Sequence, residues 1–311
     1  MFPELVRAGG RRRPKSADTD RVPIEVLWLR AQAVAAALPA FSVRSAKRLR
    51  QAARGTHPRR RAGPGDSFWQ FRPYMTGEPA GLVDWRRSAR SETLYVRQRE
   101  WETAQTVWFW VDGSPSMQFR SRRDQDSKAD RAALLALAAA RLVVAAGEKV
   151  ALYGTHSHAA GGSYGLSRLV EAIDRMRHHD SPPIPEPHDL PRHAQLVLIG
   201  DFLGESAQVD EALRHLVSLD VAGHLLQILD PVEEDFPFRG RISFESPETG
   251  ERILLDRAEA LASGYGHRIR GWTAHLGEMC RRSGWTHSVH RSDRSPATAL
   301  LALLSLTGQS L

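Results

Sequence analysis

The fold of this 311-residue chain is decided by one stretch, Thr106-Val107-Trp108-Phe109-Trp110-Val111-Asp112-Gly113-Ser114-Pro115-Ser116. Residues 106–111 form a continuous apolar run, which is typical of a strand buried on both faces of a parallel sheet. The run passes directly into a tight turn of glycine, proline and oxygen-bearing side chains. The stretch therefore predicts an interior strand whose carboxyl end carries a polar loop.

Apolar runs and helical periodicities alternate outward from this strand. We expect strands at 95–99, 149–153, 196–199, 225–229 and 285–289, and a strand-rich excursion at 232–256. We expect helices at 24–38, 129–146, 166–177, 209–219, 257–282 and 297–306. This alternation predicts an α/β fold with a doubly wound, mainly parallel sheet of the Rossmann-like kind.

Two of the predicted strands run into an aspartate. Asp112 follows the first, and the second reads Leu196-Val197-Leu198-Ile199-Gly200-Asp201. Ligands of open α/β sheets bind outside the carboxyl ends of the strands. Two carboxylates with the hydroxyls of Ser114 and Ser116 form a set of hard oxygen donors that suits Mg²⁺. The other interpretation is that Asp112 and Ser116 only cap the next helix.

Basic charge is concentrated in the first fifth of the chain. Residues 1–61 hold 15 of the 43 Lys and Arg residues but only 4 of the 36 Asp and Glu residues. Such an arm can bind nucleic acid or an anionic lipid surface, but no groove-reading motif accompanies it. We expect a solvated arm with one amphipathic helix, whose apolar face packs on the main body rather than on a membrane.

The rest of the composition excludes several classes of protein. The single cysteine, Cys280, cannot form an internal disulfide, and no apolar run is long enough to span a membrane, so we expect a soluble cytoplasmic protein. There is no nucleophile elbow and no phosphate-binding glycine-rich loop. The histidines between the two aspartates do not have a common zinc-ligand spacing. They are His156, His158, His178, His179, His188 and His193.

Three blocks of sequence resemble those of the bacterial DUF58 family, and they occur in order at fitting distances. They are Gly65-Asp66-Ser67-Phe68-Trp69-Gln70-Phe71-Arg72-Pro73-Tyr74 with Gly77-Glu78, then Val83-Asp84-Trp85-Arg86-Arg87-Ser88-Ala89-Arg90, then Leu94-Tyr95-Val96-Arg97-Gln98-Arg99-Glu100-Trp101-Glu102. The resemblance extends from about residue 60 to the C-terminus. In addition, Asp112-x-Ser114-x-Ser116 with Asp201 resembles the metal-ion-dependent adhesion site of von Willebrand factor A domains.

These resemblances imply three regions and a non-enzymatic binding module. The regions are a basic arm at 1–61, an aromatic and arginine-rich segment at 62–105, and a von Willebrand factor A-like domain at 106–311. Domains of this kind hold a divalent ion, here Mg²⁺ or Mn²⁺, on residues equivalent to Asp112, Ser114, Ser116 and Asp201. The ion accepts an acidic residue of a partner. Such proteins are commonly associated with MoxR-type AAA+ ATPases, so the implied partner is such an ATPase or its client.

The sequence departs from the family patterns at two places. The adhesion site normally includes a threonine from a loop between the two aspartates. Thr155 is the threonine between them, but it directly follows a predicted strand, so the third hydroxyl is Thr155 or a substitute, Ser163 or Ser181. Gly81 stands where the first family block usually has arginine.

Two further interpretations of the site and the arm remain open. The chain can be a metal-dependent hydrolase or nuclease that uses Asp112 and Asp201, which would need further carboxylates nearby. Asp124, Asp126 and Asp130 follow the motif, although a charged turn explains them more simply. The other alternative is nucleic-acid binding through the basic arm.

The aromatic and arginine-rich segment also has two interpretations. Tryptophan and arginine dominate interaction surfaces, so the segment can be an interface. We expect instead a small satellite core with buried tryptophans, in which arginines pair with the acidic residues. The tryptophans are Trp69, Trp85 and Trp101, and the acidic residues are Asp84, Glu100 and Glu102.

Overall fold

The structure is a computed structural model that describes residues 21–38, 68–99 and 105–306, with short gaps at 76, 156–157, 180–181 and 192–193. The chain divides into two units. One contains α1 (Ile24–Ala37) and all elements from β3 (Thr106–Val111) to α9 (Pro296–Leu306). The other contains β1 (Phe68–Pro73) and β2 (Tyr95–Arg99) and lies between α1 and β3 in the sequence.

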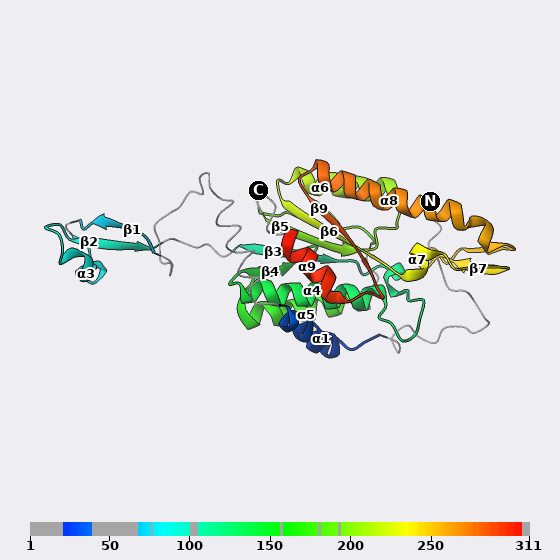
Figure 1. Ribbon diagram of the computed structural model, residues 1–311, viewed down its shortest axis with the longest axis horizontal. Helices are drawn as coiled ribbons and strands as arrows, with labels where there is room; N and C mark the ends of the chain where they lie inside the picture. Colours follow the sequence, from blue (N-terminus) through cyan, green and yellow to red (C-terminus); the bar gives the residue numbers. More distant parts are fainter. Residues whose placement is uncertain are drawn as a thin grey trace. The chain divides into compact units, whose positions relative to one another are not determined.

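A five-stranded parallel sheet forms the centre of the first unit (Figure 1). Its order is β4-β3-β5-β6-β9, and every neighbouring pair is parallel. The other four strands of the sheet are β4 (Lys149–Leu152), β5 (Gln195–Gly200), β6 (Ala222–Leu229) and β9 (Thr286–Arg291). The chain goes from β3 to β4 on one side and then to β5 on the other side, so the strand order reverses between β3 and β5. The doubly wound parallel α/β sheet predicted from the sequence is confirmed.

Helices cover both faces of this sheet (Figure 1). One face is covered by α4 (Lys128–Ala145), α5 (Gly162–His178) and α9, with α1 packed on the outer side of α4, and the other face by α6 (Ser206–Ser218) and α8 (Ala262–Arg282). Strand β5 contributes side chains to the cores on both faces of the sheet, because successive side chains of a strand point to opposite faces. Val197 and Ile199 enter the core with α4, whereas Leu196 and Leu198 enter the core with α6 and α8.

Helix α4 is buried around most of its circumference, because the sheet, α1, α5 and α9 all pack against it. The helix begins at Ser127, whose side chain accepts a hydrogen bond from the N–H of Asp130. Leu27 and Ala31 of α1 are fully buried in the same core. The guanidinium of Arg30 also donates two hydrogen bonds, of 2.8 and 2.7 Å, to the Asp126 carboxylate. The prediction that the N-terminal amphipathic helix packs on the main body is confirmed.

The excursion after β6 is a short helix followed by a β-hairpin. The helix is α7 (Pro231–Asp235), and the antiparallel hairpin joins β7 (Ile242–Glu245) to β8 (Arg252–Leu255). Phe236, Phe244 and Ala258 form a small core of their own under this hairpin. The helix expected at 257–282 is a 3₁₀ turn, Ala258–Leu261, followed by α8. The other expected strands and helices of this unit overlap elements of the structure.

The second unit pairs β1 with β2 in an antiparallel sheet and adds the short helix α3 (Trp85–Ser88). Among the side chains described in this unit, the buried apolar ones are Val83 and Val96, which face each other across a bridge. The expectation that Trp85 is buried is wrong, because 63% of the residue is exposed. Asp84 also differs from the expectation, since its carboxylate caps α3 through the N–H of Arg87. The side chains of Trp69, Trp101, Glu100 and Glu102 lie outside the described residues.

None of the helices described is both long enough and apolar enough to cross a membrane.

Candidate metal centre

The two predicted aspartates lie side by side, at the point where the strand order reverses. The parallel register pairs Val111 with Ile199, so β3 and β5 end at the same level. Beyond the last pair, the N–H of Asp112 donates to the carbonyl oxygen of Ile199 at 2.8 Å. Crevices at such switch points are the usual ligand sites of open α/β sheets.

Gly200 allows the two strand ends to approach this closely. A Cβ atom at this position would lie 2.8 Å from the Cβ of Asp112 and 2.9 Å from its Oδ2. Nonbonded carbon atoms are normally about 3.5–4.0 Å apart. Any larger residue would therefore push the Asp112 carboxylate out of its place.

All four predicted ligands belong to one buried hydrogen-bonded cluster. Asp112, Ser114, Ser116 and Asp201 are between 0 and 4% exposed. Oδ1 of Asp112 accepts a hydrogen bond from the N–H of Ser114 at 2.9 Å. The two serine Oγ atoms are 3.1 Å apart, and Ser116 Oγ donates to Oδ2 of Asp201 at 2.8 Å. The second oxygen of Asp201, Oδ1, accepts from the N–H of Leu203 at 3.1 Å.

This arrangement argues against the helix-capping interpretation. Ser127, not Asp112 or Ser116, caps helix α4. Ser114 precedes the 3₁₀ turn Pro115–Gln118 without using its side chain to cap it. Asp112 does accept one N–H bond in its own loop, but that bond occupies only one of its two carboxylate oxygens.

The other oxygen, Oδ2 of Asp112, is buried and has no hydrogen-bond partner among the described residues. Burial, and then the neighbouring charge of Asp201, raise the pKa of Asp112 well above its usual range. A buried carboxylate without a counter-charge is costly, and a bound cation is one of the ways in which proteins compensate it. The donor set of two carboxylates and two hydroxyls fits a hard divalent ion such as Mg²⁺.

Lys128, at the first turn of α4, is a member of the cluster that sequence reasoning missed. Its Nζ donates to Oδ2 of Asp201 at 2.7 Å and to Oε1 of Glu233 at 2.5 Å, and the residue is 1% exposed. Burial lowers the pKa of this ammonium, but the charges of Asp201 and Glu233 outweigh that effect and raise it overall. Burial also raises the pKa of Glu233 to about 7, in opposition to Lys128.

A second missed residue comes from the hairpin. Oε1 of Glu248, in the loop between β7 and β8, accepts a hydrogen bond from the N–H of Ser116 at 2.9 Å. Glu248 is exposed, and it is 132 residues away from Ser116 in the sequence. No local sequence pattern could have indicated this contact, because only the fold of the excursion brings the hairpin to the loop.

Thr155 and Ser163 are not among the partners in the hydrogen bonds of the cluster given above. Thr155 donates to the carbonyl oxygen of Leu152, and Ser163 lies exposed at the start of α5. Ser181 lies outside the described residues. Among the described residues between Ser116 and Asp201, Lys128 donates a hydrogen bond to the cluster.

The additional carboxylates considered for a second metal have other partners. Asp124 pairs with Arg122, Asp126 with Arg30 and Arg131, and Asp130 with Arg177. Within the described part of the chain, no group of three or more His, Cys, Asp or Glu side chains is placed to hold a metal ion. A site on this cluster therefore depends on the serine hydroxyls as well as on the carboxylates.

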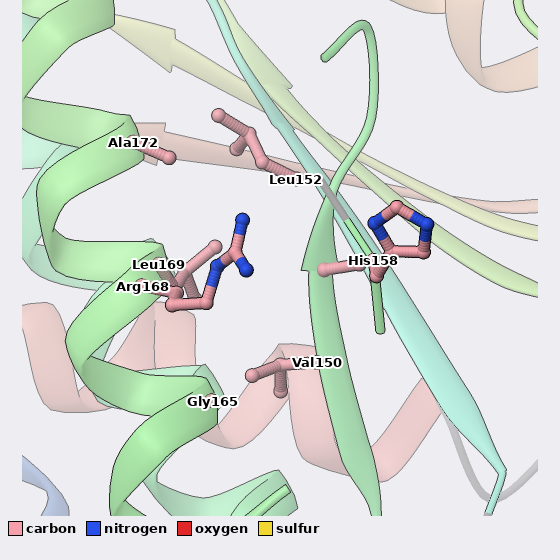
Figure 2. Close-up of a pocket in the computed structure, with 8 residues that line it drawn as sticks. Val150, Leu152, His158, Gly165, Arg168, Leu169 and Ala172 are labelled. Atoms are coloured by element: carbon pink, nitrogen blue, oxygen red, sulfur yellow. The ribbon is translucent and has the colours of Figure 1, made fainter. Parts of the chain in front are cut away.

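A pocket between α5 and β4 is separate from the cluster (Figure 2). Its walls are largely aliphatic, and Arg168 and His158 are its charged or titratable residues. None of the four predicted ligands lines it, and neither does any carboxylate. The pocket has no donor set for a cation.

The comparison with family models agrees with the family resemblance. The sequence model of the family "Protein of unknown function DUF58" matches residues 70–271. No curated protein matches the chain. A crystal structure of the conserved hypothetical protein BatB from Bacteroides thetaiotaomicron is 14% identical, covers 67% of this chain and 98% of its own, and has a TM-score of 0.37. Because the family match spans well over half of the sequence, the chain belongs to the DUF58 family.

Proposed function

We propose that this protein is a non-enzymatic interaction module of the von Willebrand factor A type that binds a partner through a divalent metal ion. Asp112, Ser114, Ser116 and Asp201 would hold Mg²⁺ or Mn²⁺, and the ion would supply a Lewis-acidic position for an acidic residue of the partner. The observation that carries the proposal is the buried Oδ2 of Asp112, which lacks a hydrogen-bond partner among the described residues although its carboxylate belongs to the same cluster as the serine hydroxyls and Asp201.

The charge of the cluster supports a divalent cation. With a cation bound and all three carboxyl groups ionised, Asp112, Asp201 and Glu233 would carry three negative charges against the single positive charge of Lys128. The balance of −2 equals the charge that Mg²⁺ would neutralise. Glu248 adds a further negative charge at the edge of the cluster.

The same contacts favour binding over catalysis. A general base must be free to take a proton from a bound group, and in the proposed site Oδ2 of Asp112, which has no partner among the described residues, would be occupied by the metal ion. Oδ2 of Asp201 already accepts from Ser116 and Lys128, and the two oxygens of Glu233 accept from Lys128 and from the N–H of Asp230. A hydrolase or nuclease remains the alternative, and phosphodiester hydrolysis that is lost in Asp112→Ala would establish it.

We propose as partner a MoxR-type AAA+ ATPase or its client in the cytoplasm, on the strength of the family resemblance. The acidic group that the ion accepts would come from the partner. Nucleic-acid binding through the basic arm is the less supported alternative, and retention of nucleic acid in place of protein in the experiment below would favour it.

Mn²⁺ binding, measured by isothermal titration, tests the metal site directly. Asp112→Asn should keep the hydrogen bond that Oδ1 accepts from Ser114 and lose the charge. Loss of a group that only supports a ligand costs 10–100-fold in affinity, so loss of a ligand charge should weaken binding by at least about 100-fold. Asp124→Asn removes a carboxylate from an exposed ion pair nearby and should bind Mn²⁺ as the wild type does. Equal binding by all three proteins would reject the site.

A pull-down from native lysate tests the partner. Wild type and Asp112→Asn are each used with Mg²⁺ and with EDTA. An AAA+ ATPase retained only by wild type in Mg²⁺ is the expected result. Equal recovery in all four samples would contradict a metal-dependent interaction and move the binding surface elsewhere on the molecule.

A further inference from the structure

We propose that Glu248 is an internal ligand of the adhesion site, so that the β7–β8 hairpin competes with the acidic residue of a partner. This inference rests on the proposed function, because it concerns how access to the same site is controlled. Its starting point is the hydrogen bond from the N–H of Ser116 to Oε1 of Glu248.

The hairpin tip is built to present this side chain. The N–H of Ser246 donates to the carbonyl oxygen of Glu251, and the N–H of Gly250 donates to the carbonyl oxygen of Ser246, both at 2.8 Å. Gly250 has a φ of +70°, a conformation that glycine adopts without strain. These bonds close a tight turn, Ser246–Glu251, with Glu248 in its middle. The carboxylate therefore projects from an ordered loop.

The base of the hairpin is fixed to the main body. Phe244 of β7 packs with Phe236 and Ala258, and Tyr265 of α8 lies 4.9 Å from Phe236, measured between ring centroids. Arg252 and Glu245 form an ion pair between the two strands at 2.8 Å. The tip is thus held over the Ser116 loop by a supported structure, and the contact does not depend on one flexible side chain alone.

Burial shows why this contact matters for a partner. The four predicted ligands are between 0 and 4% exposed, so an outside carboxylate cannot reach them while the structure stays as it is. Glu248 is an exposed acidic residue that already contacts one of these four residues. Glu248 carries a carboxylate, which is the group expected of the partner, and this carboxylate accepts a hydrogen bond from the N–H of Ser116, a proposed metal ligand. Release of the hairpin tip would remove this carboxylate and open the Ser116 loop together.

The charges of the cluster indicate when Glu248 should compete with a partner. Glu248 contacts the Ser116 loop, whose hydroxyl bonds to Asp201, so it adds negative charge beside the carboxylates of the cluster, and like charges repel. A cation on the cluster would turn this repulsion into attraction. The internal ligand should therefore act most strongly when the metal is bound, which is the state in which a partner competes.

The experiment uses Mn²⁺ and acetate, the simplest carboxylate, with the full-length protein. Acetate that reaches bound Mn²⁺ displaces water, and water-proton relaxation follows the displacement. Glu248→Ala removes the internal carboxylate, and Glu248→Gln keeps the side-chain shape and an oxygen acceptor for Ser116. Glu251→Ala is the matched control, because it removes an exposed acidic side chain from the same turn.

We expect half-saturation by acetate at a concentration about 10-fold lower in both Glu248 variants than in wild type, which corresponds to about 1.4 kcal/mol. The Glu251→Ala protein should respond as the wild type does. Mn²⁺ binding with the same acetate response in all four proteins would overturn this inference alone. Absence of Mn²⁺ binding by wild type would overturn the proposed function, and the inference with it.

Discussion

At the residue scale, position 128 requires a lysine rather than an arginine. Of the 43 basic residues in the chain, 39 are arginine, yet the group buried between Asp201 and Glu233 is a lysine. An ammonium is a compact charge with rotatable donors, whereas a guanidinium is a planar fork that prefers bidentate partners. A lysine can therefore serve two carboxylates from different elements in a site with little free volume.

Replacement of Lys128 by methionine should destabilise the protein by about 3–5 kcal/mol, because it leaves buried carboxylates without their counter-charge. Urea denaturation in EDTA measures the loss. Lys149→Met is the control, because Lys149 is the other lysine within the described residues and is exposed. Mg²⁺ should restore part of the lost stability by supplying positive charge to the same cluster. A loss below 1 kcal/mol relative to Lys149→Met would show that the carboxylates are not charged in the fold.

Gly200 is the second residue whose identity the cluster depends on. Gly200→Ala places a methyl group against the Asp112 carboxylate and 3.2 Å from the Trp110 ring, so we expect a loss of about 1–3 kcal/mol and weaker Mn²⁺ binding. At Gly204 a Cβ would meet nothing closer than 3.5 Å, so Gly204→Ala is the control. Thermal unfolding and Mn²⁺ titration compare the two variants. The explanation fails if both alanine variants behave alike.

At the scale of elements, strands β6 and β9 bury histidine side chains that the fold keeps neutral. The ring of His224 contacts the hydroxyls of Thr286 and Ser288, at 2.7 and 3.0 Å. Burial lowers the pKa of His224 to about 4, and that of His290 also to about 4. The unfolded chain therefore binds more protons than the folded chain between about pH 6.5 and 4. Each of these histidines costs stability as the pH falls through that range.

We expect His224 to reduce the free energy of unfolding by about 2 kcal/mol between pH 7.5 and 5. Urea denaturation of wild type and His224→Gln at both pH values measures the contribution of His224 alone. The comparison is needed because the buried carboxyl groups have raised pKa values and therefore increase the stability of the fold as the pH falls. The variant should lose less stability than wild type as the pH falls. His267→Gln changes an exposed histidine and should follow the wild type. Parallel pH profiles for wild type and His224→Gln would exclude a buried neutral imidazole.

Helix α1 provides a test of packing on one element. Leu27 is fully buried against α4, whereas Leu29, two residues later, is 65% exposed. Leu27→Asp should cost at least about 3 kcal/mol, because it removes a packed side chain and buries a charge. Leu29→Asp makes the same chemical change on the solvent side and should be nearly neutral. Chemical denaturation distinguishes the two, and similar losses would mean that α1 does not dock as described.

At the scale of the whole molecule, local patterns predicted the sheet but not all of the site. Residues 106–111 are a strand in the structure as predicted, because an apolar run is itself the condition for burial between two helical layers. Asp112 and Asp201 meet because parallel strands place their carboxyl ends at one edge. Lys128 and Glu248 reach Asp201 and Ser116 across 73 and 132 residues, and those contacts depend on helix position and hairpin placement. The prediction that Trp85 is buried was wrong, because composition does not reveal which side of a small two-stranded sheet is covered.

The order of elements along the chain has a consequence for biosynthesis. Helix α1 packs against α4, but a separate unit is encoded between α1 and β3. From Ala37 to the end of α4 at Ala145 the ribosome adds 108 residues, which takes roughly 5–20 s at about 5–20 residues per second. During that time the apolar face of α1 around Leu27 is exposed on the nascent chain, because α4, against which it packs, has not yet been made. We therefore expect removal of the ribosome-associated chaperones from a cell-free translation system to lower the soluble yield of the wild type. A variant with polar residues on the apolar face of α1 should lose less.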